Sequence, residues 1–429
     1  MSFTDNQKYK FSEMIIYLII FKTTIELIYI FGISESYSYD GLTLEINLVK
    51  SIISLILTFI LVFLSPKDKQ RPSTYIYIIM LYFIYVPFIS YFWLNDQSIT
   101  YAMYLWFCML IISLILKIKP RYLSFEKYPS SVLLKSIFYV FLLLNIFLIF
   151  ERGGIDSRAF DFDTVYDLRS ENNITGLLGY IVNWCAKSFF PFFFIYFYYK
   201  KKIPISVLLI SLQVLLYLSF GNKAFLFSIG VVFISALFIQ KRIFNKGMGL
   251  FLAILNIFAY VLNTTNITDS LFRAIPYRML FIPSQIQFQY YEYFNSREKV
   301  LYSEGFIGKI LNIDNALQNP VPLIISRYFL GRDSFSNTGL FSDAYYNAGI
   351  IGMIIVSVIF TVLLLIIDST TLYVPIYIVV GSLSYIMFVL NDTGLQTTLL
   401  TGGLAINIIL LQLLNSSMKS HRNHIENLH

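Results

Sequence analysis

The chain has 429 residues, of which 57% are hydrophobic and only 13% charged, and its formal net charge is +7. This small share of polar residues cannot cover the surface of a soluble globule of this length. The composition therefore excludes an ordinary soluble protein and predicts an integral membrane protein. The basic residues are dispersed among short connections, which excludes the concentrated basic surface of a nucleic-acid-binding protein.

Long apolar stretches recur along the whole chain and predict about twelve transmembrane helices, since roughly 20 residues cross a hydrocarbon core of about 30 Å. They lie at 14–31, 46–64, 74–94, 101–118, 131–150, 174–199, 203–220, 223–240, 248–265, 346–367, 373–390 and 399–415. The runs are continuous rather than alternating, which predicts an all-α, polytopic fold in a single membrane domain, residues 1–429. The pair 203–220 and 223–240 is either two spans or a re-entrant hairpin around Gly221.

Lys and Arg are concentrated in alternate connections, and such connections face the cytoplasm in membrane proteins. The basic connections contain Lys8 and Lys10; Lys67, Lys69 and Arg71; Lys117, Lys119, Arg121 and Lys127; Lys200, Lys201 and Lys202; Lys241, Arg242 and Lys246; and Lys419 and Arg422. The connections 32–45, 95–100 and 391–398 contain neither residue type. This pattern predicts that both termini, including a tail at 416–429, are cytoplasmic, and that two sizeable loops at 151–173 and about 264–345 face outward.

Ionisable groups inside the apolar stretches are candidates for function, because they are costly in a membrane. Lys22 and Glu26 are four residues apart, which predicts a structural ion pair on one helical face. Lys187 and Lys223 face the same outward cavity as the loop arginines, or else Lys187 only extends its charge to the membrane surface.

The first outward loop, 151–173, contains both signs of charge. Its members are Arg152, Arg158, Arg169, Asp156, Asp161, Asp163 and Asp167. An arginine offers a fork of donors to a phosphate, and an aspartate can position or deprotonate a sugar hydroxyl. The alternative is a solvated loop whose charges pair with one another, each pair contributing about 0–1 kcal/mol.

The second outward loop, 264–345, contains seven basic residues despite its predicted position outside. They are Arg273, Arg278, Arg297, Lys299, Lys309, Arg327 and Arg332. The apolar segments 275–283 and 319–330 are too short to span and predict interfacial helices. Arg278 and Arg327 would meet a substrate phosphate at headgroup height, or else ordinary lipid phosphates. Arg297, Lys299 and Lys309 lie in polar sequence, where simple solvation is expected.

Aromatic residues in the same loop predict a belt at the membrane surface. They are Tyr277, Phe288, Tyr290, Tyr291, Tyr293 and Phe294. The end of the loop gathers Arg332, Asp333, Asn337, Asp343, Tyr345 and Asn347 at the mouth of the next span. There, the Gly349 to Gly352 spacing predicts tight packing between helices.

Several chemistries are excluded by residues the sequence lacks. The three histidines, His421, His424 and His429, are in the predicted cytoplasmic tail, so no outward step uses histidine as a base or metal ligand. Cys108 and Cys185 lie within spans and form no CxxC pair. No GxxxxGK[ST] loop is present, which argues against ATP-driven work. We therefore expect neither a metal nor a cofactor.

The layout resembles the Wzy-type polymerases of bacterial O-antigen and capsule repeat units: about a dozen spans, both ends inside and arginine-rich outer loops. Short motifs carry the resemblance, namely VYDLRS (165–170), GLLGY (176–180), SFGNKAF (219–225), YRMLFIP (277–283) and SNTGLFSDAYYNAGIIG (336–352). The Arg-x10-Gly spacing of that family is found from Arg297 to Gly308, whereas its Arg-x15-Gly spacing is absent. The resemblance thus covers most of the chain by layout but only these pieces by motif.

The resemblance implies glycosyl transfer on the outer face of the bacterial cytoplasmic membrane. A growing glycan on undecaprenyl pyrophosphate would be donated to the next lipid-linked repeat, with a flippase and a chain-length regulator as partners beside the bilayer and no nucleic acid. The implied substrate-binding residues are Arg158, Arg169, Arg278, Arg327, Arg332, Lys223 and Tyr345, and Asp343 or Asp167 would orient the acceptor hydroxyl.

Two alternatives remain open from the sequence. A lipid-linked oligosaccharide flippase or other secondary transporter would be expected to have short loops and internal symmetry. An O-antigen ligase would share the lipid-linked donor, but the ligases have an outer-loop histidine that this chain lacks.

Overall fold

The structure is a computed structural model of the whole chain and describes residues 8–120, 130–151, 154–160, 168, 176–305, 308, 310, 312–314 and 317–426. Regular secondary structure in these residues is helical, and strand-like pairing is limited there to the isolated bridges Lys8–Asp68 and Glu45–Asn95. The predicted all-α class is therefore confirmed for the described part of the chain.

The chain divides into two compact units, each built from three separate stretches. Unit 1 contains Met1–Lys119, Ile243–Leu364 and Phe388–Gln396, and unit 2 contains Pro120–Arg242, Leu365–Met387 and Thr397–His429.

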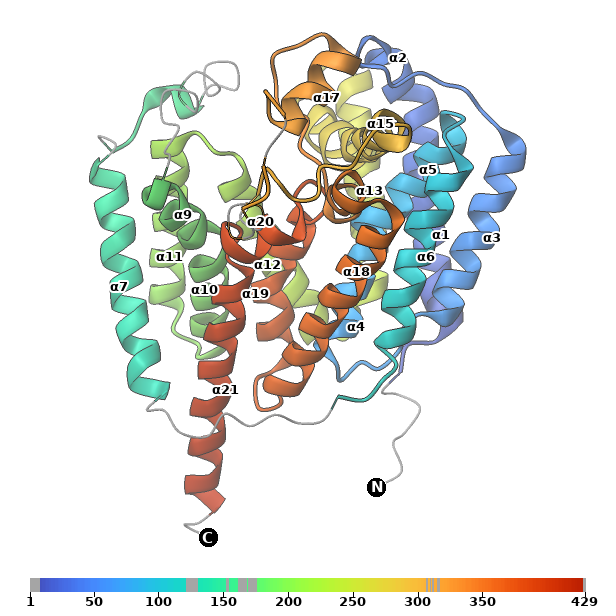
Figure 1. Cartoon of the computed structure of the whole chain (residues 1–429). Helices are drawn as coiled ribbons and strands as arrows, with labels where there is room; N and C mark the ends of the chain where they lie inside the picture. The colour runs from blue at the N-terminus through green and yellow to red at the C-terminus, as the bar shows by residue number, and fades with distance from the viewer. Residues whose placement is uncertain are drawn as a thin grey trace. The chain divides into compact units, whose positions relative to one another are not determined.

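The helices of unit 1 include both long rods and short turns (Figure 1). They are α1 (Phe11–Ile28), the π-helix η2 (Tyr29–Ile33), α2 (Ser34–Ser36), η3 (Ser38–Asp40), α3 (Leu48–Leu64), α4 (Pro72–Met80), η4 (Leu81–Tyr85), α5 (Val86–Leu94), α6 (Ile99–Ile115), α13 (Phe244–Thr264), α14 (Ser270–Phe272), the π-helix η7 (Arg273–Phe281), α15 (Ile282–Asn295), α17 (Val321–Leu330) and most of α18 (Leu340–Thr370).

The helices of unit 2 are α7 (Ser130–Glu151), η5 (Ser157–Phe160), α9 (Gly176–Trp184), η6 (Cys185–Phe189), α10 (Phe190–Tyr199), α11 (Ile203–Phe220), α12 (Ala224–Gln240) and α21 (Leu404–Glu426), together with most of α19 (Ile376–Val389) and of α20 (Leu395–Leu400). The predicted tail at 416–429 is a continuation of α21 as far as Glu426.

Helices lie over all the predicted apolar stretches, but they differ in length. Seven of the described helical segments are long and apolar enough to cross a membrane: Phe11–Ser36, Pro72–Leu94, Ser130–Glu151, Gly176–Tyr199, Ile203–Phe220, Phe244–Thr264 and Leu340–Thr370. Shorter apolar helices of 10–17 residues are Leu48–Leu64, Ile99–Ile115, Ala224–Gln240, Val321–Leu330 and Ile376–Val389. The structure thus supports a membrane protein, whereas twelve spans and the orientation of the termini stay predictions.

The stretch 203–240 forms two separate helices, α11 and α12, joined at Gly221. That glycine has φ +64°, the left-handed conformation that commonly ends a helix, and its N–H donates to the Tyr217 carbonyl at 2.8 Å. α11 belongs to the long apolar set and α12 to the short one.

Helices α1 and α13 pack side by side and parallel in unit 1. The Asn245 side chain donates to the Glu13 carbonyl at 3.1 Å near the start of both helices, and the Tyr260 hydroxyl donates to the Phe31 carbonyl at 3.2 Å near their ends. Gly249 allows this approach, because a Cβ there would lie 2.8 Å from the Tyr17 carbonyl oxygen. Both helices therefore begin at one end of unit 1 and lead to the other, where α2 and α17 lie (Figure 1).

The core of unit 1 is the continuous segment α4–η4–α5, in which every residue from Pro72 to Leu94 is buried. Its neighbours include α1, α3, α6 and α15. An apolar helix covered on all sides is the expected centre of a membrane bundle.

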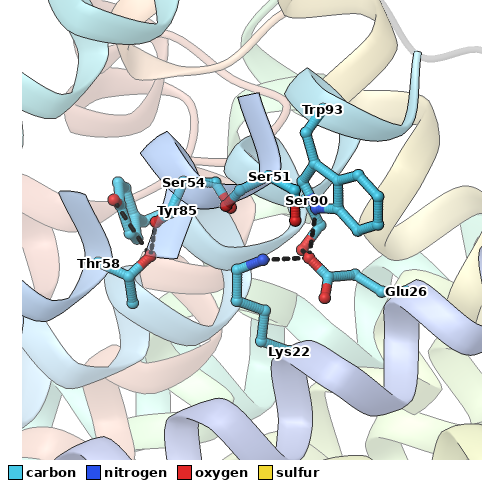
Figure 2. Close-up of polar contacts among 8 residues, drawn as sticks. All are labelled: Lys22, Glu26, Ser51, Ser54, Thr58, Tyr85, Ser90 and Trp93. Atoms are coloured by element: carbon cyan, nitrogen blue, oxygen red, sulfur yellow. Dashed lines mark hydrogen bonds and ion pairs between the residues drawn. The ribbon is translucent and has the colours of Figure 1, made fainter. Parts of the chain in front are cut away.

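A buried ion pair joins α1 to this core (Figure 2). The Lys22 ammonium contacts the Glu26 carboxylate, as the four-residue spacing predicts. The same carboxylate accepts hydrogen bonds from Ser90 Oγ at 2.9 Å and Trp93 Nε1 at 2.7 Å. A buried pair is tolerated only when such extra donors offset its lost hydration, so this network fixes α1 against α5.

Candidate functional site

The residues that could carry chemistry in unit 1 lie at the end away from the start of α1. We call this the loop end of unit 1 and define it as residues 34–47 and 94–98 with the described part of 265–347. Four features build it: a buried aspartate, an aromatic stack, a docked short helix and a broken span.

Asp40 contacts residues from three segments of the loop end. Its side chain is 6% exposed, its Oδ2 accepts a hydrogen bond from the Tyr277 hydroxyl at 2.5 Å, and its Oδ1 lies 2.7 Å from Arg332 Nη1. The Gln285 amide donates to the Asp40 backbone carbonyl at 2.8 Å. Among the described residues Oδ1 has no aligned hydrogen-bond donor, so its contact with Arg332 is an ion pair by distance alone. The positive charge of Arg332 therefore offsets part of the free-energy cost of burying the Asp40 carboxylate.

Tyr277 carries the aromatic stack beside this carboxylate. The centre of its ring lies 3.9 Å from that of Tyr37, and the two rings are nearly parallel. The Phe272 ring also stacks on Tyr37, with 6.1 Å between the ring centres. Burial raises the pKa of Tyr277, and the hydrogen bond and charge of Asp40 raise it further, against an opposing effect of Arg278. The hydroxyl therefore stays protonated and acts as a donor to Asp40.

Helix α17 is a short element held at both ends. At its start, the Val321 N–H donates to the Glu304 carboxylate at 3.0 Å, which satisfies one of the free N–H groups of the first turn. After its end, the Tyr290 hydroxyl donates to the Ser336 carbonyl at 2.8 Å. Burial raises the pKa of Glu304, and the hydrogen bond from Val321 partly offsets this effect.

Arg327, on the same helix, is paired with Asp333 at 2.6 Å, and both side chains are substantially exposed at 48% and 78%. An exposed pair of this kind contributes about 0–1 kcal/mol, so a stronger anionic ligand could take the place of Asp333.

Span α18 is broken near its beginning. Ala348 and Gly349 leave the helical conformation, and Gly349 has φ +61° and ψ −153°, a combination that essentially only glycine adopts. Two of the freed carbonyls are used by residues 300 and 301: the Val300 N–H donates to the Tyr346 carbonyl and the Leu301 N–H to the Asn347 carbonyl, both at 3.0 Å. The break thus lets the turn that begins at Val300 bond to the end of the first half-helix.

Asp343 lies in that first half-helix. The Asn347 side chain donates to the Asp343 carbonyl at 2.8 Å and accepts from the Tyr302 N–H at 2.8 Å. Gly394 approaches so closely that a Cβ there would lie 2.3 Å from the Asp343 carboxyl carbon. Burial, followed by the charge of Asp343, raises the pKa of Tyr302 to about 12, so a phenol stays protonated near this carboxylate.

The predicted site residues fall into two groups. Arg278, Arg327, Arg332, Asp343 and Tyr345 belong to the loop end of unit 1, where the three arginine side chains are exposed. Tyr345 is buried and packs on Tyr101, Tyr104 and Tyr291, with the Lys299 ammonium 4.8 Å from its ring centre.

Arg158 and Lys223 belong to unit 2, at the α11–α12 turn. The Asp156 N–H donates to the Leu218 carbonyl at 3.2 Å, which places η5 beside the end of α11, and Lys223 follows that helix. Arg158 pairs with Asp156 at 2.8 Å, and the hydrogen bonds from Arg158 lower the pKa of that aspartate. Lys187 is also in unit 2, in η6. Asp167 and Arg169 lie outside the described residues.

Three predictions, two for the second loop and one for the start of the next span, are wrong. The aromatic belt is not formed by Tyr277, Phe288, Tyr290, Tyr291 and Phe294, which are buried because η7 and α15 pack into the helices of unit 1. Of the predicted belt only Tyr293 is partly exposed.

Gly349 and Gly352 do not mediate packing between two spans. Gly349 forms the break in α18, and the atoms nearest to a Cβ on Gly352 belong to Ala344 and Ala348 of the same segment. The close spacing of these glycines therefore serves a turn within α18.

Arg297 and Lys299 are not simply solvated. The Arg297 guanidinium lies 3.9 Å from the centre of the Tyr293 ring, and the Lys299 ammonium donates to the Phe294 carbonyl at the end of α15. A cation there complements the helix dipole. Burial lowers the pKa of Lys299. Lys309 lies outside the described residues.

The sequence interpretation missed Asp40, Tyr37 and Glu304. The connection 32–45 was used only to assign topology, although its Tyr-Ser-Tyr-Asp-Gly run carries a turn signal at Gly41, whose φ is +82°. Glu304 has no local signal, because its role depends on the distant Val321.

No group of three or more His, Cys, Asp or Glu side chains that could hold a metal ion is found among the described residues. No family model, curated protein or solved structure matches the chain.

Proposed function

We propose that the protein polymerises undecaprenyl-pyrophosphate-linked oligosaccharide repeat units on the outer face of a bacterial cytoplasmic membrane. The observation that carries the proposal is the coexistence, at the loop end of unit 1, of three exposed arginines and a carboxylate, Asp343, set among tyrosines. Long apolar helices in the same chain suit a lipid-linked substrate.

The chemistry requires two kinds of group. Charge builds on the pyrophosphate as the glycosidic bond of the donor breaks, and guanidinium groups stabilise such charge with paired N–H donors. In this proposal Arg278, Arg327 and Arg332 of unit 1 bind pyrophosphate, and Tyr345 of the same unit contacts the substrate. Arg158, Arg169 and Lys223 stay candidates from the sequence for substrate binding. Asp343 or Asp167 orients the acceptor hydroxyl and takes its proton as the new bond forms.

The test is polymer formation by the purified protein in proteoliposomes supplied with lipid-linked repeat units, scored by glycan chain length. Arg278→Ala should slow chain growth by roughly 10²–10³-fold, the usual effect of removing one group that stabilises transition-state charge. Arg242→Ala is a matched control, since Arg242 is also exposed but lies in a connection predicted to be cytoplasmic. Normal chain length from Arg278→Ala and Arg332→Ala would remove both residues from the site.

A secondary transporter of the same lipid-linked oligosaccharide is a second candidate, and the broken span α18 favours it. Transporters commonly bind their substrates at discontinuous helices, and Gly349 interrupts a helix that is otherwise long enough to span. Deletion of the gene separates the two functions. Loss of a polymerase leaves surface lipid carrying one repeat unit, whereas loss of a flippase leaves none.

A further inference from the structure

The connection between α1 and α3 brings an exposed ring to the arginines of the loop end. Tyr39 is 68% exposed, although its neighbours in sequence, Tyr37 and Asp40, are both buried. Ser38 and Gly41 beside it are exposed as well, so this part of the turn faces away from the packed interior and its aromatic ring is accessible to a ligand.

The buried partners of this turn fix where Tyr39 lies. Asp40 is tied to Tyr277 and to Arg332, and Tyr37 stacks on Tyr277 at 3.9 Å with its own ring centre 6.1 Å from that of Tyr39. Tyr39 and Arg278 both lie close enough to Tyr277 to affect its electrostatics. Arg278 follows Tyr277 directly in the sequence. Tyr39 and Arg332 neighbour Tyr37 and Asp40, the two residues that contact the ring and the hydroxyl of Tyr277.

Arg332 keeps donors for a ligand while it contacts Asp40. Its side chain is 52% exposed, whereas that of Asp40 is 6% exposed. A guanidinium has five N–H donors, and Arg332 contacts Asp40 through Nη1. The buried carboxylate thus orients the guanidinium while donors remain for a phosphate oxygen.

We propose that Tyr39 is a stacking platform for the sugar attached directly to the pyrophosphate, with that pyrophosphate on Arg278 and Arg332 and with Asp40 as a positioning residue for Arg332. The inference rests on the proposed function, because it assigns the pyrophosphate to those arginines. It adds a substrate contact from the α1–α3 connection, and it explains why an apolar ring is exposed among charged groups. Sugar faces rich in C–H groups pack on aromatic rings, and phosphate oxygens pair with guanidinium donors.

Two lipid probes test the platform with full-length protein in nanodiscs. One is undecaprenyl pyrophosphate bearing an oligosaccharide, and the other is undecaprenyl pyrophosphate without sugar. Tyr39→Ala should weaken binding of the sugar-bearing probe by roughly 2- to 12-fold, as expected for loss of one ring contact, and leave binding of the sugar-free probe unchanged. Tyr39→Phe should bind both probes as the unsubstituted protein does, because it keeps the ring.

Two further variants give the comparison its controls. Tyr139→Ala removes a tyrosine of similar exposure, 63%, from α7 in unit 2 and should change neither affinity. Arg332→Ala should weaken both probes equally, since both carry the pyrophosphate.

Equal affinities of Tyr39→Ala and the unsubstituted protein for the sugar-bearing probe would overturn the platform. Equal weakening of both probes would also overturn it, because that is the behaviour of a tyrosine that contacts only headgroups. If the sugar-selective loss is found but the protein never elongates repeat units, the platform stands and the polymerase proposal fails. If the protein elongates repeat units without the sugar-selective loss, the polymerase proposal stands and the platform fails. If the protein binds neither probe, both proposals fail.

Discussion

Arg332 has two separable roles in the proposals above, and a double variant distinguishes them. One role is structural, because Arg332 Nη1 lies 2.7 Å from the Oδ1 atom of the buried Asp40. The other is binding of pyrophosphate. Arg332→Ala removes both roles at once, so loss of activity in that variant alone would not identify the cause.

The structural role can be given a magnitude. Two unit charges 2.7 Å apart interact by about 6 kcal/mol at an effective dielectric constant of about 20 and by about 1.5 kcal/mol in water. The arginine side chain is half exposed, so the smaller value is the better guide, and bonds to charged groups in proteins contribute about 1.5–3 kcal/mol. We therefore expect Arg332→Ala to lower the free energy of unfolding by about 1–3 kcal/mol.

Asp40→Asn removes the buried charge that needs compensation and keeps an oxygen to accept the Tyr277 hydroxyl. In the Arg332→Ala, Asp40→Asn double variant no carboxylate is left without its partner, so the combined loss should be smaller than the sum of the single losses by about 1–2 kcal/mol. Equilibrium unfolding of the four proteins in mixed micelles measures this coupling. Strict additivity would refute the assignment of Arg332 as the partner of Asp40.

The activity of the double variant then decides the second role. If Arg332 binds pyrophosphate, the double variant is close to the Asp40→Asn protein in stability yet fails to extend glycan chains in proteoliposomes. If it extends them normally, Arg332 only neutralises Asp40, and Arg278 and Arg327 are left as the candidates for the pyrophosphate.

Three further predictions concern the fold around the site. Gly349→Ala should lower the free energy of unfolding by about 1–3 kcal/mol, because φ +61° with ψ −153° strains any other residue. Gly230→Ala, in the middle of α12, is the control and should be neutral or stabilising. Equal free energies of unfolding for the two variants would contradict this prediction. Since burial raises the pKa of Glu304, its contribution to the free energy of unfolding is greatest below the ordinary glutamate pKa and declines as pH rises through the raised value. Glu304→Gln should remove this decline in the melting temperature above about pH 4, and an unchanged slope would contradict the assignment. Trp93→Phe removes the 2.7 Å hydrogen bond from Trp93 Nε1 to Glu26 and should lower the free energy of unfolding by about 1.5–3 kcal/mol. An unchanged free energy of unfolding would refute this role of Trp93.

The parts of the fold that the sequence predicted are those governed by local pattern. Continuous apolar runs specify helices wherever a membrane is the solvent, so the stretches from 14–31 to 399–415 coincide with helices. Spacing within one helix was equally informative, and the Lys22–Glu26 pair forms as four-residue spacing requires. In both cases the deciding interaction lies within one or two helical turns.

Where the sequence prediction failed, a distant partner decided the outcome. Phe288 and Tyr291 have the composition of an interfacial belt, but they are buried because Phe88 and Tyr101 stack on them at 4.5 and 4.8 Å. Nothing within α15 indicates those partners, which lie almost two hundred residues earlier. Periodicity identifies an apolar face, whereas the choice between lipid and protein as its neighbour is made by tertiary packing.

Local sequence also identifies the arginines more readily than the residues that support them. A cation in a loop predicted to face outward violates a rule of topology, so Arg278, Arg327 and Arg332 attract notice from sequence alone. Asp40 violates no rule, because an acidic residue in a connection predicted to face outward is ordinary, and only the 2.7 Å contact with Arg332 gives it a role. If that contact orients Arg332 for phosphate, the short connection between α1 and α3 belongs to the site together with the long loop, and Tyr39→Ala should weaken binding of a sugar-bearing substrate by roughly 2- to 12-fold.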